Sequence, residues 1–110
     1  MACIPHRVNV QEVKELLGFS GSGLWVRGEW LMACIGEAKG VVVIPNGVKR
    51  IAPYAFEGQW QLDAVCFPEE LVSIGDNAFK DCTGLEMVEF PNTLESIGNG
   101  SFRNCHLFHT

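Results

Sequence analysis

Positions 45 to 108 of this chain repeat with a period of 23 residues. Prolines stand at positions 45, 68 and 91, each 23 residues after the last. Three apolar columns recur at the same spacing: Val48, Leu71 and Leu94; Ile51, Ile74 and Ile97; and Phe56, Phe79 and Phe102. The same residue class at so many fixed offsets predicts a repeat solenoid, in which each unit buries its apolar face against its neighbours.

The same order of short elements is predicted in each repeat. An alternating segment such as Leu85-x-x-Val88-x-Phe90 is typical of a strand, and Pro91 ends it because proline has no N–H to donate to a ladder. A second extended piece then leads to Gly98, a turn residue able to take positive φ. The run Asp76-Asn77-Ala78-Phe79 indicates a single helical turn capped by Asp76. Besides the isoleucine and phenylalanine columns, the side chains predicted to face the core are Val42, Val65 and Val88, and Ile44, Phe67 and Phe90.

Residues 1–39 carry a different pattern. Asn9 followed by Glu12 has the form of a capping box, and the apolar residues after it predict a short helix that ends at Gly18. Two apolar, aromatic-rich runs at 24–27 and 30–34 are separated by Gly28-Glu29, which predicts a β-hairpin with a type II′ turn. We therefore expect an α/β repeat solenoid. An N-terminal helix and hairpin cap would cover residues 1–39, and a right-handed coil of about three repeats, with parallel strands and short helical turns, would cover 40–110.

One family resemblance is carried by the repeat itself. The run Leu71-x-x-Ile74-Gly75-x-x-Ala78-Phe79-x-x-Cys82-x-x-Leu85-x-x-Val88-x-Phe90-Pro91 resembles the repeat of BspA-like leucine-rich repeat proteins, and the similarity covers residues 41–110. The first copy departs from it, with Ala52-Pro53 at the glycine turn and Gln59 in place of the cysteine. The resemblance implies a non-enzymatic interaction module of a family often found on cell surfaces. It transfers no catalytic residue, because the motif residues are all structural.

Charge and hydropathy exclude several classes of partner. The net charge of −5 lies in the repeats and no basic stripe is present, which argues against nucleic acid and anionic membrane. No apolar run reaches 18 residues, so no membrane insertion is expected. The first ten residues lack the apolar segment of a signal peptide, which predicts a cytoplasmic protein, or one at the cell surface or secreted if a leader has been removed.

The open face of the predicted parallel sheet is the candidate binding surface. Because side chains alternate along a strand, the inward positions leave an outward set: Val41, Val43, Ala64, Cys66, Met87 and Glu89. Five of these six are apolar, and contiguous apolar patches tend to mark interaction sites. We expect a protein partner of unknown identity to bind here, unless the N-terminal helix folds over this face.

Cysteine and histidine residues supply the competing hypothesis, a small ligand-binding protein or thiol enzyme. Five cysteines, with no C-x-x-C and no zinc-ligand spacing, favour free thiols. Cys82 and Cys105 share a column and are predicted to be buried thiols, whereas Cys66 is the candidate for a reactive one. His106 and His109 stand beside Cys105 without a second ligand pair. We therefore expect no catalytic residue, metal or cofactor.

The two ends of the apolar stack also raise predictions. Trp25, Trp30 and Trp60 are expected to pack over the first coil, with exposure of Trp25 or Trp30 as the alternative. The last coil is expected to have uncovered flanks at Leu94, Ile97, Phe102 and Phe108, which predicts a homodimer joined through the C-terminal coil. The alternatives are a tail at 106–110 that folds back, or a following repeat of a longer array.

Overall fold

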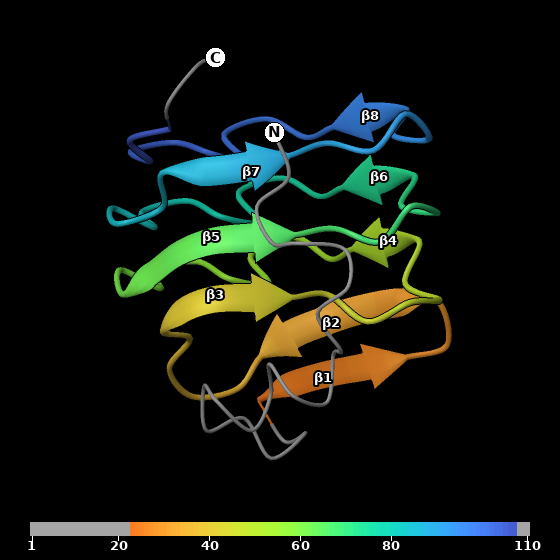
Figure 1. The fold of residues 1–110 in the computed structure, drawn as a ribbon, viewed down its shortest axis with the longest axis horizontal. Coiled ribbons are helices and arrows are strands. Elements are labelled where there is room, and N and C mark those ends of the chain that lie inside the picture. The colour runs from red at the N-terminus through yellow and green to blue at the C-terminus, as the bar shows by residue number, and fades with distance from the viewer. Residues whose placement is uncertain (1–22, 108–110) are drawn as a thin grey trace.

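The computed structural model describes residues 23–107, which form two β-sheets (Figure 1). One sheet has the strand order β1-β2-β4-β6-β8 and the other β3-β5-β7. The strand bounds are β1 Leu24–Arg27, β2 Trp30–Cys34, β3 Gly40–Val43, β4 Arg50–Ile51, β5 Leu62–Cys66, β6 Ser73–Ile74, β7 Met87–Glu89 and β8 Ser96–Ile97.

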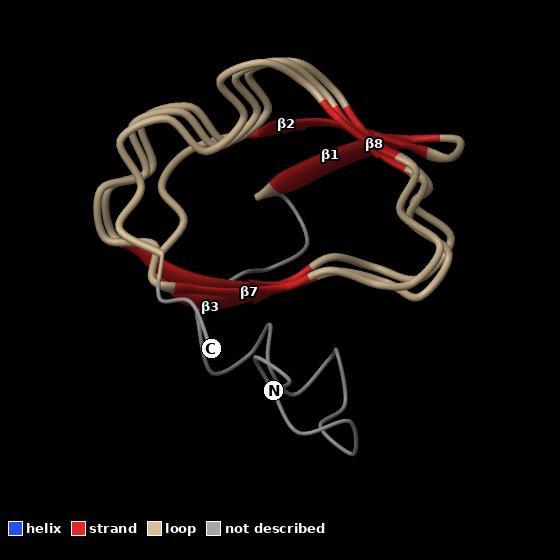
Figure 2. Ribbon diagram, turned by 90° about the horizontal axis from the view of Figure 1, so that it is seen from above, coloured by secondary structure: helices blue, strands red, loops and turns tan. Residues whose placement is uncertain are grey.

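Each repeat contributes one strand to each sheet. Val42 pairs in parallel with Val65, and Val65 with Val88, while Ile51 pairs with Ile74 in the other sheet. Seen along the stack, the coils superimpose, with the two sheets on opposite sides of a closed outline (Figure 2). The predicted repeat solenoid with parallel strands is therefore confirmed.

The core consists of the columns read from the sequence. The Phe79 ring stacks between Phe56 and Phe102, with centroid distances of 4.8 Å and 5.2 Å. Ile51 and Ile74 are buried, but Ile97 is 46% exposed. Phe90, predicted to be inward, is also partly exposed although it stacks on Phe67. Both exceptions lie in the third coil, where the described chain supplies a neighbouring coil on one side only.

The predicted helical turns are wrong: no helix occurs between residues 23 and 107. The corner that contains Phe56 is a series of tight turns instead, whose alternate N–H groups donate to the next coil. Phe56 donates to the Ala78 carbonyl at 2.7 Å, and Phe79 donates to the Ser101 carbonyl at 2.7 Å. The positive φ of 57° at Asn77 interrupts helical geometry as well. Stacking thus satisfies the backbone groups that a helical turn would have paired internally.

Glycine is needed at positions 75 and 98 because of close approach, not because of positive φ. Neither residue is among those with positive φ. A Cβ on Gly75 would lie 2.6 Å from the Pro53 nitrogen, and one on Gly98 would lie 2.5 Å from the Asp76 nitrogen. Asp76 does not cap its own turn either, since its Oδ1 accepts from the Asn99 N–H at 2.8 Å. Both corners are therefore fitted against the neighbouring coil.

The predicted hairpin is confirmed, and its strands have the expected bounds. β1 and β2 pair antiparallel around Gly28-Glu29, and Gly28 has the positive φ, 61°, that the first turn position requires. β2 then pairs in parallel with β4, which places the fully buried Leu31 beside Ile51. The helix predicted after Asn9 lies outside the described residues. The division of the chain at residue 39 stays a prediction.

Candidate functional site

The β3-β5-β7 sheet brings the six predicted binding residues together in two adjacent columns. Val41 pairs with Ala64 and Ala64 with Met87; Val43 pairs with Cys66 and Cys66 with Glu89. Val41, Val43 and Met87 are half-buried, and Glu89 is exposed. Parallel pairing thus assembles a mostly apolar surface from residues about 23 positions apart in the chain.

Ala64 differs from the expectation of an accessible residue, because it is only 4% exposed. It lies on β5, the middle strand, opposite the larger side chains of Val41 and Met87. A single methyl group between two longer neighbours offers little area to a partner. The accessible part of this column therefore comes from Val41 and Met87.

Cys66 is not the reactive thiol that the sequence suggested. It is disulfide-bonded, whereas Cys34, Cys82 and Cys105 are free thiols among the described residues. The expectation of free cysteines holds for those three and fails for Cys66. The thiol-enzyme hypothesis consequently loses its candidate nucleophile.

Cys82 and Cys105 act as hydrogen-bond donors within the stack. The Sγ of Cys82 donates to the Phe56 carbonyl and that of Cys105 to the Phe79 carbonyl, both at 3.0 Å. Their mutual side-chain contact, together with burial, raises the pKa of the Cys82 thiol, and the same contact lowers the pKa of Cys105. Burial likewise raises the pKa of Cys34. Cys82 and Cys34 are thus held as thiols, in line with structural roles.

The C-terminal histidines form no metal site in the part of the chain that is described. His106 is exposed, and no group of three or more His, Cys, Asp or Glu residues able to hold a metal ion occurs among residues 23–107. His109 lies outside that range.

All three tryptophans are more exposed than expected. Trp25 is 48%, Trp30 39% and Trp60 62% exposed, so packing over the first coil does not bury them. The Arg50 guanidinium lies 5.9 Å from the centroid of the Trp30 ring. No such charged partner accompanies the Trp60 ring among the described residues.

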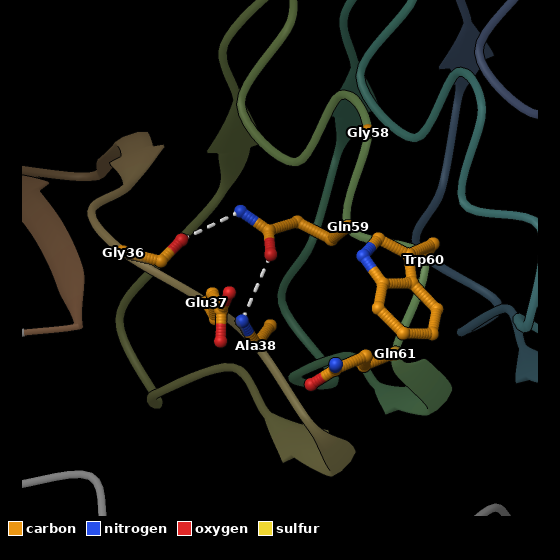
Figure 3. Close-up of a pocket in the computed structure, with 7 residues that line it drawn as sticks. All are labelled: Gly36, Glu37, Ala38, Gly58, Gln59, Trp60 and Gln61. Carbon is orange, nitrogen blue, oxygen red and sulfur yellow. Dashed lines mark hydrogen bonds between the residues drawn. The ribbon is translucent and has the colours of Figure 1, made fainter.

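Trp60 borders a pocket of about 190 Å³ that the sequence did not predict (Figure 3). The pocket lies between the loop before β3 and the corner before β5, and Figure 3 shows Trp60 and Gln61 on one side of it and the 36–38 segment on the other. Its lining consists of Gly36, Glu37, Ala38, Gly58, Gln59, Trp60 and Gln61.

Gln59 fixes one wall of this pocket. Its side-chain amide donates to the Gly36 carbonyl at 2.9 Å and accepts from the Ala38 N–H at 2.8 Å (Figure 3). Gln59 occupies the column of Cys82 and Cys105, and its longer side chain reaches backbone groups that a cysteine could not. The departure of the first copy from the repeat pattern was therefore the available signal of a special corner.

The side-chain amide oxygen of Gln61 has no hydrogen-bond partner among the described residues. This atom, Oε1, is buried. An unsatisfied buried amide oxygen costs on the order of 1–3 kcal/mol. An unpaired buried oxygen of this kind is uncommon in folded proteins.

No helix in the described part of the chain is both long and apolar enough to cross a membrane.

The stacked coils and parallel strands are those of a repeat protein of the leucine-rich class. A family model described as the BspA type leucine rich repeat region (6 copies) matches residues 39–110, which is more than half of the chain. The chain therefore belongs to the BspA type leucine-rich repeat family.

A solved structure supports the same assignment. The crystal structure of a leucine rich repeat protein of T. pallidum matches with a TM-score of 0.64 and 32% sequence identity, over 68% of this chain. The match covers 37% of the T. pallidum chain, so this chain spans well under half the length of that protein. No curated protein matches the sequence.

Proposed function

We propose that this protein is a non-enzymatic interaction module that binds a protein partner through the open face of the β3-β5-β7 sheet. The observation that supports this most directly is the pairing of half-buried apolar residues, Val41, Val43 and Met87, on the outward side of three parallel strands. A solvated sheet face normally carries polar side chains at such positions, whereas apolar patches mark interaction sites.

The rigidity of the sheet supports the same proposal. The inward side chains Val42 and Val65 are buried in the core, which anchors β3 and β5. The outward residues are thus presented in a fixed arrangement, and a partner would pay little conformational entropy to order them. Membership of a leucine-rich repeat family agrees with such a role.

The test is a double substitution, Val43→Lys with Met87→Lys. Two ammonium groups in an apolar contact would each have to lose water without a paired charge, so we expect partner binding to be abolished. The readout is the amount of partner recovered by pull-down from the source cell, with circular dichroism and thermal unfolding to establish that the variant is folded.

A matched control adds the same charge elsewhere. Thr83→Lys with Asn92→Lys also introduces two lysines, at exposed positions outside the sheet face. This control should recover as much partner as the unmodified chain. Normal binding by the Val43→Lys, Met87→Lys variant would show that the face is not the site.

A further inference from the structure

The pocket bounded by residues 36–38 and 58–61 has the chemistry of a receptor for a cation. We infer that it binds the guanidinium group of an arginine side chain in a peptide ligand. The site is separate from the open face of the β3-β5-β7 sheet, because the two share no residue. The proposal therefore stands or falls independently of the function proposed above.

The charge of the lining favours a cation. Glu37 is the one charged side chain among the seven lining residues, and it is negative and exposed. No ion pair engages Glu37 within the described part of the chain. The chain as a whole carries a net charge of −5, which adds to the attraction for a basic ligand.

Trp60 supplies a flat aromatic wall. Trp60 is 62% exposed, so folding leaves much of this residue accessible to a ligand. Guanidinium groups stack on indole rings through cation–π attraction, for which tryptophan is the best partner. The Arg50 guanidinium near the Trp30 ring is an example of this pairing elsewhere in the same chain.

Gln61, another lining residue of the pocket, carries an unpaired amide oxygen. Its Oε1 is buried without a hydrogen bond in the described residues, and an arginine side chain has five N–H donors and no acceptor. Gln59, in contrast, is already bonded at both ends of its amide, to Gly36 and Ala38. Glu37 and Gln61 thus line the same pocket, one wall of which is braced by Gln59. Because the Gln61 Oε1 is itself buried, a guanidinium N–H reaches it only when the Gln61 side chain turns toward the pocket.

The pocket is large enough for the end of one side chain only. At about 190 Å³ it is smaller than the pockets of about 300–1,000 Å³ that hold drug-sized ligands. It has room for a planar head group and several water molecules, not for a folded peptide. The rest of the ligand would lie outside.

The pocket exists at this corner because the first coil is not stacked there on a full repeat. In the corresponding corner of the second copy, a Cβ on Gly84 would lie only 2.5 Å from the Trp60 carbonyl oxygen, so the backbones of the two corners approach closely at that point. The first copy also carries Gln59-Trp60-Gln61 where the second carries Cys82-Thr83-Gly84. The first corner therefore carries larger polar and aromatic side chains than the second.

The test is an NMR titration of the full ¹⁵N-labelled chain with the blocked peptide acetyl-Gly-Arg-Gly-amide. We expect saturable shifts of the Trp60 indole N–H, with a dissociation constant of about 1 mM, the scale for one small group. Citrulline in place of arginine keeps the shape and removes the charge, and should bind about tenfold more weakly. Glucose serves as an uncharged hydroxyl-bearing probe and should give no saturable shift.

Protein variants locate the binding. Trp60→Ala and Glu37→Gln, read on the backbone amides of Gly36 and Gly58, should each weaken binding of the arginine peptide by about twofold to thirtyfold, the range for losing one such contact. Tyr54→Ala and Glu69→Gln remove an exposed ring and an exposed carboxylate elsewhere and should leave binding unchanged.

Three results would overturn the inference: equal binding of the arginine and citrulline peptides, full binding by both pocket variants, or saturable shifts at Trp60 with glucose but not with arginine. The Val43→Lys, Met87→Lys variant should bind the peptide normally. This separates a failure at the pocket from a failure at the sheet face.

Discussion

Tyr54 occupies a backbone conformation that its side chain disfavours. Its φ is 62°, in the left-handed region, where a Cβ with a bulky substituent is crowded by the backbone. The same column holds Asn77 and Gly100 in the next two coils, and both residue types tolerate positive φ. Tyr54 is 54% exposed, so burial of its side chain does little to offset this strain.

Replacing Tyr54 with asparagine should therefore stabilise the protein. We expect Tyr54→Asn to raise the free energy of unfolding by about 1 kcal/mol, because the side chain then suits its φ. Urea unfolding followed by circular dichroism measures the change. Tyr54→Val is the opposing control, since a β-branched residue at this φ should lower stability. A lower stability for Tyr54→Asn than for the unmodified chain would contradict this explanation.

At the scale of elements, the phenylalanine column connects the three coils. Phe79 is fully buried and stacks on Phe56 at an interplanar angle of 7° and on Phe102 at 2°. Phe67 also meets Phe79, edge to face, with 5.9 Å between centroids. Because one ring contacts its own coil and both neighbours, its loss would loosen all three.

The truncation Phe79→Ala should lower the free energy of unfolding by roughly 3–5 kcal/mol, through lost burial and the cavity that remains. The readout is the midpoint of urea unfolding. Phe90→Ala removes the same ring from a position that is 39% exposed, and it should lower the free energy of unfolding by clearly less. If Phe79→Ala lowers the free energy of unfolding by no more than Phe90→Ala does, the assignment of the core is wrong.

Some elements could be predicted from the sequence because their cause is local or periodic. The hairpin followed from Gly28-Glu29 between two apolar runs, and the stacked columns followed from the period. The helical turns failed because their backbone partners lie one coil away. The Phe56 N–H, for instance, is satisfied by the Ala78 carbonyl. A single repeat gives no indication of such a partner.

The candidate sites likewise have features that the sequence predicts and features that it does not. The outward columns of the sheet could be predicted, since alternation fixes which side chains share a face. The burial of Ala64 could not, because it depends on the size of its neighbours across two strand pairs. The pocket beside Trp60 was missed because it is defined by spacing between two backbone segments. Only the departure at Gln59 pointed toward that corner.

At the scale of the whole molecule, the two ends of the stack differ in how far their apolar residues are covered. At the N-terminal end, β2 pairs with β4 and covers the isoleucine column with the buried Leu31. In the third coil, β7 and β8 are the edge strands of their sheets, and Ile97 is 46% exposed where Ile51 is 1% and Ile74 2%. Leu94 and Phe102 are only half-buried, and Phe108 lies outside the described residues.

We propose that a second copy covers this flank, giving a homodimer joined through the C-terminal coil. A two-fold axis places one patch on its own counterpart and closes the assembly, which removes apolar surface and edge strands from water together.

Light scattering after size exclusion should give twice the monomer mass of 12.1 kDa at tens of micromolar. Ile97→Glu should return the mass to that of the monomer, because a carboxylate would be buried against its own copy across the axis. Val26→Glu changes an aliphatic residue on the hairpin that is 40% exposed, close to the 46% of Ile97, and should leave the dimer intact. A mass of 12.1 kDa for the unmodified chain at every concentration would exclude the dimer.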